Sequence, residues 1–338
     1  MSLRSFTFGA VTSVVLALSA AAVTAQAADT EAVKLGFAKC AHCLPMALTP
    51  DLATGVKIEA INFNSGNDVL TALVSKSIDV AQVTYLHYIT ALDKGFDVVA
   101  ISGQVNGGSE ILTAKGIELK ADDWTGLKAL IADRKAKGEP LRVAASRGNA
   151  QDIHMRGAFL KNGIDANKDV QFVNIPNPSD HAAALQRGEV DVICTVEPFA
   201  SQIRGSGVGR HFTLPYDQAA GNLTNLIVTR SDVIKEHPKA VEATVASVVA
   251  LVDKLKADKG AWVDTINKYT GMDKTVAAEA LKNASPDYAM HKDSTLAIAA
   301  MMRDLKYISH DVSAAAEKNL DYKFLETVTN KPKTELGF

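Results

Sequence analysis

Two short segments of this 338-residue sequence carry side chains that could bind a ligand or a metal ion. The first is the turn Ser146-Arg147-Gly148-Asn149, which follows the apolar run 141–145 and directly precedes residues with helical spacing. A helix start exposes unpaired N–H groups and the positive end of the dipole, and an arginine can contact a carboxylate, sulfonate or phosphate with two hydrogen bonds. The turn therefore indicates an anion site, although an ordinary capped helix with a solvated arginine has the same pattern.

The second segment is Cys40-Ala41-His42-Cys43. In an exported protein, two cysteines spaced C-x-x-C could form a small disulfide loop. The same cysteines, His42 and Met46 also make a soft-metal ligand set, although no second Cys/His cluster completes a structural zinc site. A disulfide or simple thiol loop, a thiol redox role and a metal site are therefore all open. Cys40 and Cys43 are therefore a possible disulfide, and we expect no resident metal or cofactor.

The elements that must position these segments alternate between strands and helices. From residue 141 to residue 199 the order is strand, helix, strand, helix, strand, with short connections. This order favours a parallel sheet covered by helices, with binding loops at the carboxyl ends of the strands. Residues 32–114 show the same alternation, and from residue 231 onward helical patterns follow one another with almost no strand. The predicted fold class is therefore α/β, with each half a mainly parallel sheet and with a helical C-terminal tail.

The pattern divides the chain into a leader and two lobes. We expect a signal peptide over residues 1–27, the first part of lobe 1 over 28–112, lobe 2 over 113–222, and a return strand with C-terminal helices of lobe 1 over 223–338. Extended segments near 110–114 and 223–229 would join the lobes, and lobes joined in this way can close over a ligand by a hinge motion.

The leader has the three parts of a secretory signal peptide. Arg4 gives a positive start, residues 6–23 are apolar, and Ala25-Gln26-Ala27 fits a small-residue cleavage site. We expect cleavage near Ala27 and a periplasmic protein, a membrane anchor being the alternative. The net charge of −2 gives no basic surface for nucleic acid.

Three motifs point to a known family. A polar Ser-Gly loop, a leucine-containing helix and an Ile-Asp-Val strand extend over residues 63–80, and the run 182–192 is followed by Glu197-Pro198-Phe199. The third motif covers residues 230–241, after the return strand. In this order, behind a signal peptide, they resemble extracytoplasmic solute-binding proteins of ABC importers, of the taurine/nitrate/aliphatic-sulfonate type. The resemblance covers Val33 to Asn267.

The resemblance implies a two-lobed type II periplasmic-binding-protein fold whose ligand-contacting loops follow predicted strands. The cysteine loop stands where the family has ligand-facing polar residues. The ligand-binding residues expected on this basis are Cys40, His42, Ser65, Gly66, Asn67, Thr84, Tyr85, Ser146, Arg147, Gly148, Asn149, Pro176 and Glu197. Structural roles are open for several of them. Ser65-Gly66-Asn67 could be only a turn and cap, Tyr85 could pack on a helix, and Glu197 could pair with a backbone amide or with Arg204.

The function that the resemblance implies is capture of a small organic anion, such as a sulfonate or carboxylate, for delivery to an ABC permease in the inner membrane. We expect a monomer without a catalytic residue. One alternative is a carrier of a metal or metal complex that uses Cys40, His42 and Cys43. Another is a same-fold enzyme of thiamine or menaquinone precursor metabolism, with Glu197 and the cysteine loop as candidate catalytic groups. His154 and His181 are expected near the cleft, at the surface or behind the ligand contacts.

Overall fold

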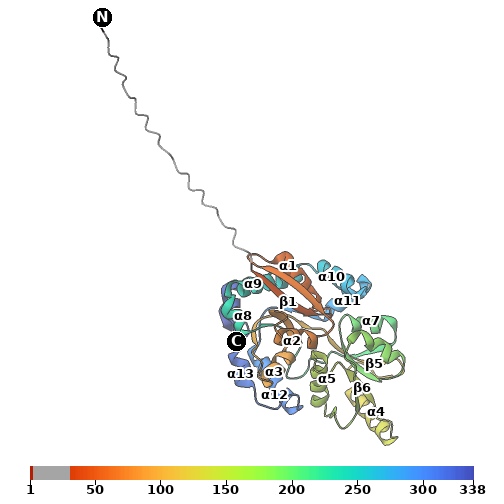
Figure 1. Ribbon diagram of the computed structural model, residues 1–338. Coiled ribbons are helices and arrows are strands. Elements are labelled where there is room, and N and C mark those ends of the chain that lie inside the picture. Colours follow the sequence, from red (N-terminus) through yellow and green to blue (C-terminus); the bar gives the residue numbers. More distant parts are fainter. Residues whose placement is uncertain (3–30) are drawn as a thin grey trace. The chain divides into compact units, whose positions relative to one another are not determined.

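The computed structural model describes residues 1–2 and 31–338. The predicted signal peptide and its cleavage site at Ala27 fall outside the described residues, apart from the first two. Residues Glu31–Phe338 fold as one unit with two β-sheets, and each sheet forms the core of one lobe (Figure 1). Among the described residues, no helix combines the length and the apolar character needed to span a bilayer.

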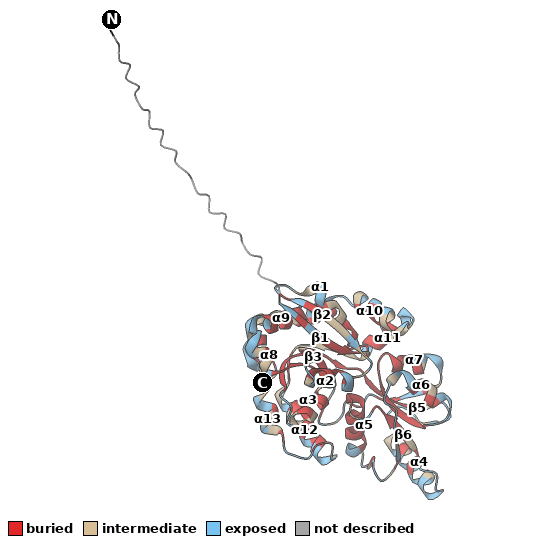
Figure 2. Cartoon of the chain, viewed as in Figure 1, coloured by how far each residue is buried: buried red, intermediate tan, exposed pale blue. Residues whose placement is uncertain are grey.

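Lobe 1 is built on a sheet with the strand order β11-β4-β10-β3-β1-β2. Strand β1 runs parallel to β2 and β3, and β10 runs antiparallel to β3 and β4. The inner strands are almost wholly buried, as expected for a sheet with helices on both faces (Figure 2). The strands are β1 (Ala32–Ala38), β2 (Lys57–Phe63), β3 (Val80–Thr84), β4 (Val99–Gly107), β10 (Asn225–Thr229) and β11 (Ala284–Asp287).

Lobe 2 is built on a sheet with the strand order β7-β6-β8-β5-β9. Strand β6 runs parallel to β7 and β8, whereas β5 runs antiparallel to β8 and β9. The strands are β5 (Ser109–Ala114), β6 (Arg142–Ala145), β7 (Gln171–Asn174), β8 (Val192–Val196) and β9 (Gly209–Thr213). The helices of this lobe are α4 (Trp124–Ala136), α5 (Ala150–Lys161), the 3-10 turn η2 (Pro178–Asp180), α6 (His181–Gln186) and α7 (Phe199–Ser206).

The helices of lobe 1 come from both ends of the chain. Those that follow its first three strands are η1 (Leu44–Leu48), α1 (Thr49–Leu52), α2 (Gly66–Val74) and α3 (Tyr85–Asp93). The C-terminal set is α8 (Ser231–Glu236), α9 (Pro238–Ala257), α10 (Gly260–Thr270), α11 (Lys274–Ala280), η3 (Leu281–Asn283), α12 (Lys292–Asp304), α13 (Ser313–Lys318), α14 (Lys323–Thr329) and η4 (Lys333–Glu335). Helix α9 begins at a proline, which suits a first helical turn, and its apolar face packs against β4 and β11.

The chain crosses between the lobes at two adjacent places. It leaves lobe 1 between β4 and β5 through Gly107 and Gly108, whose φ angles are 92° and 86°. It returns between β9 and β10, where the Thr224 hydroxyl donates a hydrogen bond to the Gly107 carbonyl at 2.9 Å. Because glycine adopts positive φ without the steric penalty of other residues, these two glycines let the chain turn sharply at the crossing. Both crossings therefore lie side by side, as a two-strand hinge requires.

The α/β class predicted from the sequence is confirmed, but each sheet is mixed, because β10 in lobe 1 and β5 in lobe 2 run antiparallel to both of their neighbours. The other differences are local. The polar segment 205–209 is the end of α7 and the start of β9, and the helical tail contains the short strand β11. Both strands lie at sheet edges, where one side of the strand is free of a partner, so polar residues and Pro286 are tolerated there. Edge strands give a weak alternation signal, which explains why the sequence did not reveal them.

Candidate functional site

A small cavity lies where the two lobes meet. Its volume is about 40 Å³, and at 10–15 Å³ for each water-sized sphere this is room for about three water molecules. The walls come from the ends of strands β1, β2, β3, β7 and β8 and from the start of α5, so the cavity lies at the carboxyl ends of strands from both sheets. The lining residues are Ala38, Lys39, Cys40, His42, Cys43, Asn64, Ser65, Gly66, Gln82, Val83, Thr84, Asn149, Ala150, Gln151, Pro176, Pro178 and Val196.

Three helices begin at this cavity. Helix α2 starts after Ser65, α3 after Thr84 and α5 after Asn149. The Ser65 and Thr84 hydroxyls cap their own helices by accepting a backbone N–H three residues on, whereas the Asn149 side chain makes no capping hydrogen bond. The first N–H groups of each helix have no acceptor within the helix, and each dipole places partial positive charge at its start. The three starts together favour an anion in the cavity.

The starts of α2 and α5 face each other across the lobe boundary. A Cβ atom at Gly66 would lie 3.1 Å from Asn149 Oδ1, and a Cβ atom at Gly148 would lie 3.6 Å from Asn67 Oδ1. His87 fixes the lobe 1 side, because its Nε2 donates to Asn67 Oδ1 at 3.1 Å. The glycine at position 66 thus leaves room for the His87 ring and for the Asn149 side chain of the other lobe.

The formal charges around the cavity add to the effect of the dipoles. Lys39 is the charged residue of the lining, and no carboxylate is among the described residues that form it. His42 also lines the cavity, but burial, with a smaller contribution from His154, lowers its pKa to about 3. The imidazole is therefore neutral at pH 7, and the attraction for an anion comes from Lys39 and the helix starts.

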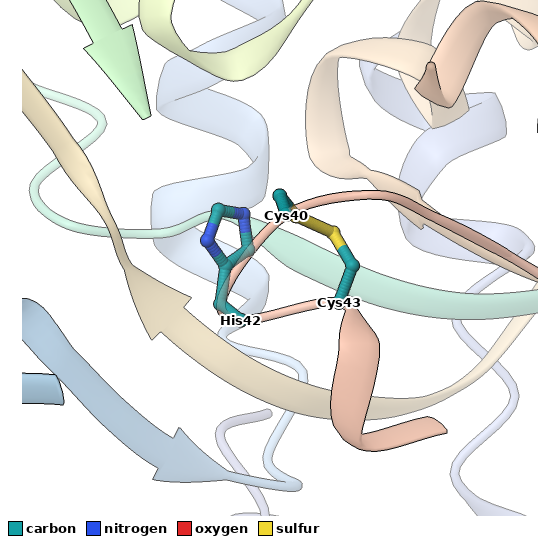
Figure 3. A group of neighbouring side chains, drawn as sticks. All are labelled: Cys40, His42 and Cys43. Carbon is teal, nitrogen blue, oxygen red and sulfur yellow. A yellow bond between two sulfur atoms is a disulfide. The ribbon is translucent and has the colours of Figure 1, made fainter. Parts of the chain in front are cut away.

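The cysteine loop forms one wall of the cavity and is fixed in three ways. Cys40 and Cys43 form a disulfide with their Cα atoms 5.0 Å apart, beside the His42 ring (Figure 3). The Ala41 carbonyl accepts a hydrogen bond from Trp262 Nε1 at 2.6 Å. The Ala41 N–H donates to the Glu197 carbonyl of lobe 2 at 2.8 Å. Backbone hydrogen bonds to both lobes therefore hold the loop in addition to the disulfide.

Seven of the residues predicted to bind ligand line the cavity, and six do not. The seven are Cys40, His42, Ser65, Gly66, Thr84, Asn149 and Pro176. The six outside the lining are Asn67, Tyr85, Ser146, Arg147, Gly148 and Glu197.

Three of these six, Asn67, Ser146 and Gly148, are held by neighbouring side chains. Asn67 is held by His87, as described above. Ser146 is buried with its hydroxyl 3.4 Å from His181 Nε2. The Gly148 N–H donates to Asp152 Oδ2 at 3.1 Å. These hydrogen bonds hold the two loops in place.

The other three, Tyr85, Arg147 and Glu197, have surroundings outside the lining. Arg147 is exposed, with its guanidinium 5.8 Å from the centre of the Phe172 ring. Tyr85 is buried on α3, and its hydroxyl has no partner among the described residues. Glu197 Oε2 accepts the Ser201 N–H at 2.9 Å and Glu197 Oε1 lies 3.4 Å from Arg204 Nη2. Packing for Tyr85 and a structural pairing for Glu197 are the alternatives that the sequence left open.

His154 and His181 are fully buried rather than at the surface. His154 joins the two crossings, because its Nε2 donates to the Leu223 carbonyl at 3.1 Å and its Nδ1 accepts from the Ser109 hydroxyl at 2.8 Å. His181 donates in the same way to the Ile175 carbonyl. Burial lowers the pKa of each to about 4, so both are neutral at pH 7.

Several residues of the lining are outside the set predicted to bind ligand, namely Lys39, Asn64, Gln82, Gln151 and Pro178. Lys39 and Asn64 directly follow β1 and β2, so the rule that sites lie after strands would have found both. A wider groove of about 460 Å³ lies next to the cavity and shares Lys39, Asn64 and Pro178 with it. These three residues stand between the cavity and the groove.

Two sheets joined by a double crossing, with a cavity between them, define a periplasmic-binding-protein fold, and solved structures agree. The nitrate-binding protein NrtA of Synechocystis PCC 6803 aligns with a TM-score of 0.76 at 17% identity over 91% of each chain. The alkanesulfonate-binding protein SsuA of Xanthomonas axonopodis pv. citri, bound to MOPS, aligns with a TM-score of 0.70 at 18% identity, over 86% of this chain and 99% of that one. The likeness to both structures is one of fold.

The family follows from the sequence match. The NMT1-like family model matches residues 26–266, and the chain belongs to this family. Among curated proteins, the chain is 30% identical over 123 residues to the nitrate/nitrite binding protein NrtA of Synechococcus elongatus. That match covers 36% of this chain and 28% of the relative, so it spans less than a third of the relative's length.

Proposed function

We propose that this chain is the solute-binding protein of an ABC importer and that it captures a small oxyanion in the cavity between its lobes. The observation that carries the proposal is the meeting of three helix starts, α2, α3 and α5, at one cavity whose charged lining residue is Lys39. The names of the similar proteins agree with this chemistry, since they bind nitrate, nitrite or an alkanesulfonate.

The volume of the cavity narrows the choice of solute. About 40 Å³ holds an anion of about four heavy atoms, such as nitrate, bicarbonate or a sulfonate head group. The carbon chain of a longer sulfonate or carboxylate would have to pass Lys39 and Asn64 into the adjoining groove. The primary ligand is therefore an oxyanion group, and the groove decides whether a tail is accepted.

The proposal has three further parts. The chain is exported to the periplasm, it acts there as a monomer without enzymatic turnover, and it delivers its solute to an inner-membrane permease. The family match, the fold and the crossing geometry support it. Lobes joined by two adjacent crossings can close on a ligand, which gives a permease a means of distinguishing the loaded protein from the empty one.

The test is a binding screen on the mature chain expected after Ala27. Nitrate, nitrite, bicarbonate, methanesulfonate and longer alkyl sulfonates and carboxylates are added separately, and unfolding is followed by thermal shift and binding by calorimetry. A ligand present at 100 times its dissociation constant stabilises the folded state by about 2.7 kcal/mol. A shift from one oxyanion class supports the proposal, and the absence of any shift across the panel contradicts it.

A pair of variants on one helix locates the site. Asn149→Asp places a carboxylate at the start of α5, and Asn162→Asp makes the same change at its end. Two unit charges about 4 Å apart near a protein surface repel by about 4 kcal/mol, so Asn149→Asp should weaken anion binding at least tenfold. An aspartate at a helix start does not destabilise the helix, so this loss should come without a fall in stability. Equal binding by both variants would place the anion elsewhere.

A further inference from the structure

The loop that carries the disulfide also holds three potential metal ligands. Cys40, His42 and Cys43 each offer one ligand atom, and these atoms lie within 4.8 Å of one another. All three residues are buried, and all three line the cavity between the lobes. Figure 3 shows the imidazole and the disulfide projecting from the same short loop.

His42 gives an independent indication of a missing partner. Its ring nitrogens make no hydrogen bond among the described residues, and Nδ1 is buried without a partner. Buried polar atoms in folded proteins are nearly always paired. The unpaired Nδ1 lies against Gly108, and no hydrogen bond fixes the His42 ring, which lines the cavity. The other buried histidines of the chain, His87, His154 and His181, all have hydrogen-bonding partners.

We propose that reduction of the Cys40–Cys43 disulfide converts this loop into a site for Zn²⁺, with Cys40, His42 and Cys43 as protein ligands and a fourth position open to the cavity. Thiolate and imidazole are the ligands that zinc prefers, and three protein ligands with one open position are a recurrent arrangement. The proposal uses the cysteine loop alone and does not depend on which anion the cavity binds.

The redox step needs a two-electron reductant, and a dithiol reductant supplies it. The S–S bond between Cys40 and Cys43 breaks, the dithiol becomes a disulfide, and its two protons and two electrons give two protein thiols. Binding of Zn²⁺ then releases a proton from each thiol as the two Zn–S bonds form. The two thiolates balance the charge of the ion, so the site as a whole is neutral.

The loop should keep its shape after the disulfide opens, because contacts outside the bridge hold its backbone. Ala41 is bound through its carbonyl to Trp262 and through its N–H to the Glu197 carbonyl, and the His42 carbonyl accepts from Asn225 Nδ2 at 3.4 Å. Within the loop, the Cys43 N–H donates to the Cys40 carbonyl at 3.0 Å. The ligand atoms therefore stay close to one another in the dithiol form.

The experiment compares oxidised and reduced mature protein. The reduced sample is prepared anaerobically with a phosphine, which is then removed, and both samples are equilibrated with Zn²⁺ against a chromophoric chelator. Reduced protein should retain about one zinc ion per chain, because the three ligands form a single site. Oxidised protein should retain none. With Co²⁺ in place of zinc, only the reduced protein should show a thiolate-to-metal charge-transfer band.

The third cysteine provides a matched control. Cys194 is a buried thiol in β8, so Cys194→Ser removes one thiol and should leave zinc binding unchanged. Cys40→Ser and Cys43→Ser should abolish it, and His42→Gln should weaken it at least tenfold. Retention of zinc by the Cys40→Ser/Cys43→Ser double variant, or its loss in Cys194→Ser, would overturn the assignment.

A labelling measurement on the unaltered chain covers the case in which a cysteine variant does not fold. Reduced protein is treated with iodoacetamide with and without Zn²⁺, and the alkylated cysteines are located by peptide mass spectrometry. Zinc should protect Cys40 and Cys43 together. Equal labelling of this pair with and without zinc would show that the loop is not a zinc site.

Discussion

The two lobes each present helix starts to the cavity, but they hold them by different means. Lobe 1 uses neutral groups and a covalent bond, namely the Cys40–Cys43 disulfide and the Thr84–His87 capping pair. Lobe 2 holds its loop with a buried ion pair, in which Asp152 and Arg156 are 2.8 Å apart. Both are fully buried or nearly so, at 0% and 2% exposure. The loop of lobe 1 is thus tied by a redox-sensitive bond, and that of lobe 2 by a contact that depends on charge.

The charges of Asp152 and Arg156 in lobe 2 offset each other, so this pair adds no net charge beside the cavity. Asp152 accepts from the Gly148 N–H and from the Tyr307 hydroxyl of lobe 1. The Arg156 guanidinium lies 4.3 Å from the centre of the Phe172 ring. These two charges neutralise each other below the loop, so lobe 2 presents to the cavity the start of α5 and neutral lining residues such as Asn149 and Gln151. The formal positive charge at the cavity comes from Lys39 in lobe 1.

The largest effect should come from breaking the ion pair. Asp152→Ala leaves the Arg156 guanidinium buried without its carboxylate, which destabilises a protein by about 3–5 kcal/mol. Asp133→Ala is the matched control in the same lobe, because its pair with Lys137 has the same spacing but is exposed, at 62% and 53%. Exposed pairs contribute about 0–1 kcal/mol. Urea unfolding of the two variants measures the contrast, and equal losses would contradict it.

The next effect concerns pH. Burial lowers the pKa of His181 in lobe 2 from 6.5 to about 4. The unfolded chain therefore binds a proton that the folded chain does not, and stability is lost as pH falls from about 6.5 towards 4. At about 1.4 kcal/mol for each pH unit, the loss from this one histidine is about 3 kcal/mol.

The measurement compares the unaltered chain with His181→Gln. Gln keeps a polar group that can bond the Ile175 carbonyl but does not titrate. Urea unfolding free energies are measured at pH 7.5, 6 and 5 for both proteins. The difference between them should shrink as pH falls, whereas parallel pH curves would show that this histidine does not carry the acid sensitivity.

The effects predicted for Asp152 and His181 depend on the burial of their contacts, which the sequence alone does not show. Alternating apolar strands and helical spacing predicted the α/β class and the strand ends that meet at the cavity, because both follow from local periodicity. Arg156 is four residues from Asp152 and Thr195 is 14 residues from His181, so these partners are near in the chain. Only the folded arrangement buries them and brings Tyr307 to Asp152.

The same limit explains why the sequence pointed to Arg147 rather than Lys39 as the cation of the anion site. Position 147 lies in the loop before α5, and sequence spacing says which loop holds an arginine but not to which side it points. In the structure the Arg147 side chain turns towards Phe172 and solvent. Lys39 follows β1 beside the cysteine loop and lines the cavity instead.

The third prediction tests which lobe supplies the charge. Lys39→Gln should weaken anion binding about tenfold or more, because a hydrogen bond to a charged group contributes about 1.5–3 kcal/mol. Arg147→Gln removes the same charge from lobe 2 and should leave the dissociation constant within about twofold, since its guanidinium lies on the exposed side of the loop. Calorimetry with the anion found in the screen decides between them. A larger loss in Arg147→Gln would move the anion site to the lobe 2 loop.

The smallest predicted effect is a difference between two glycines: Gly148, which lies just before α5, and Gly66, the first residue of α2. Gly148 has a φ of 82° and only Asn67 near its missing side chain, so Gly148→Ala should destabilise the protein by about 1 kcal/mol through backbone strain alone. Gly66 has an ordinary φ, but a methyl group there would overlap the His87 ring and crowd Asn149 of lobe 2. Gly66→Ala should therefore displace the His87 ring and crowd Asn149, so it should weaken ligand binding as well as lower stability. Gly148→Ala should change stability and leave binding unaltered. If both variants changed only stability, the contact between the starts of α2 and α5 would not be part of the closed, ligand-binding state.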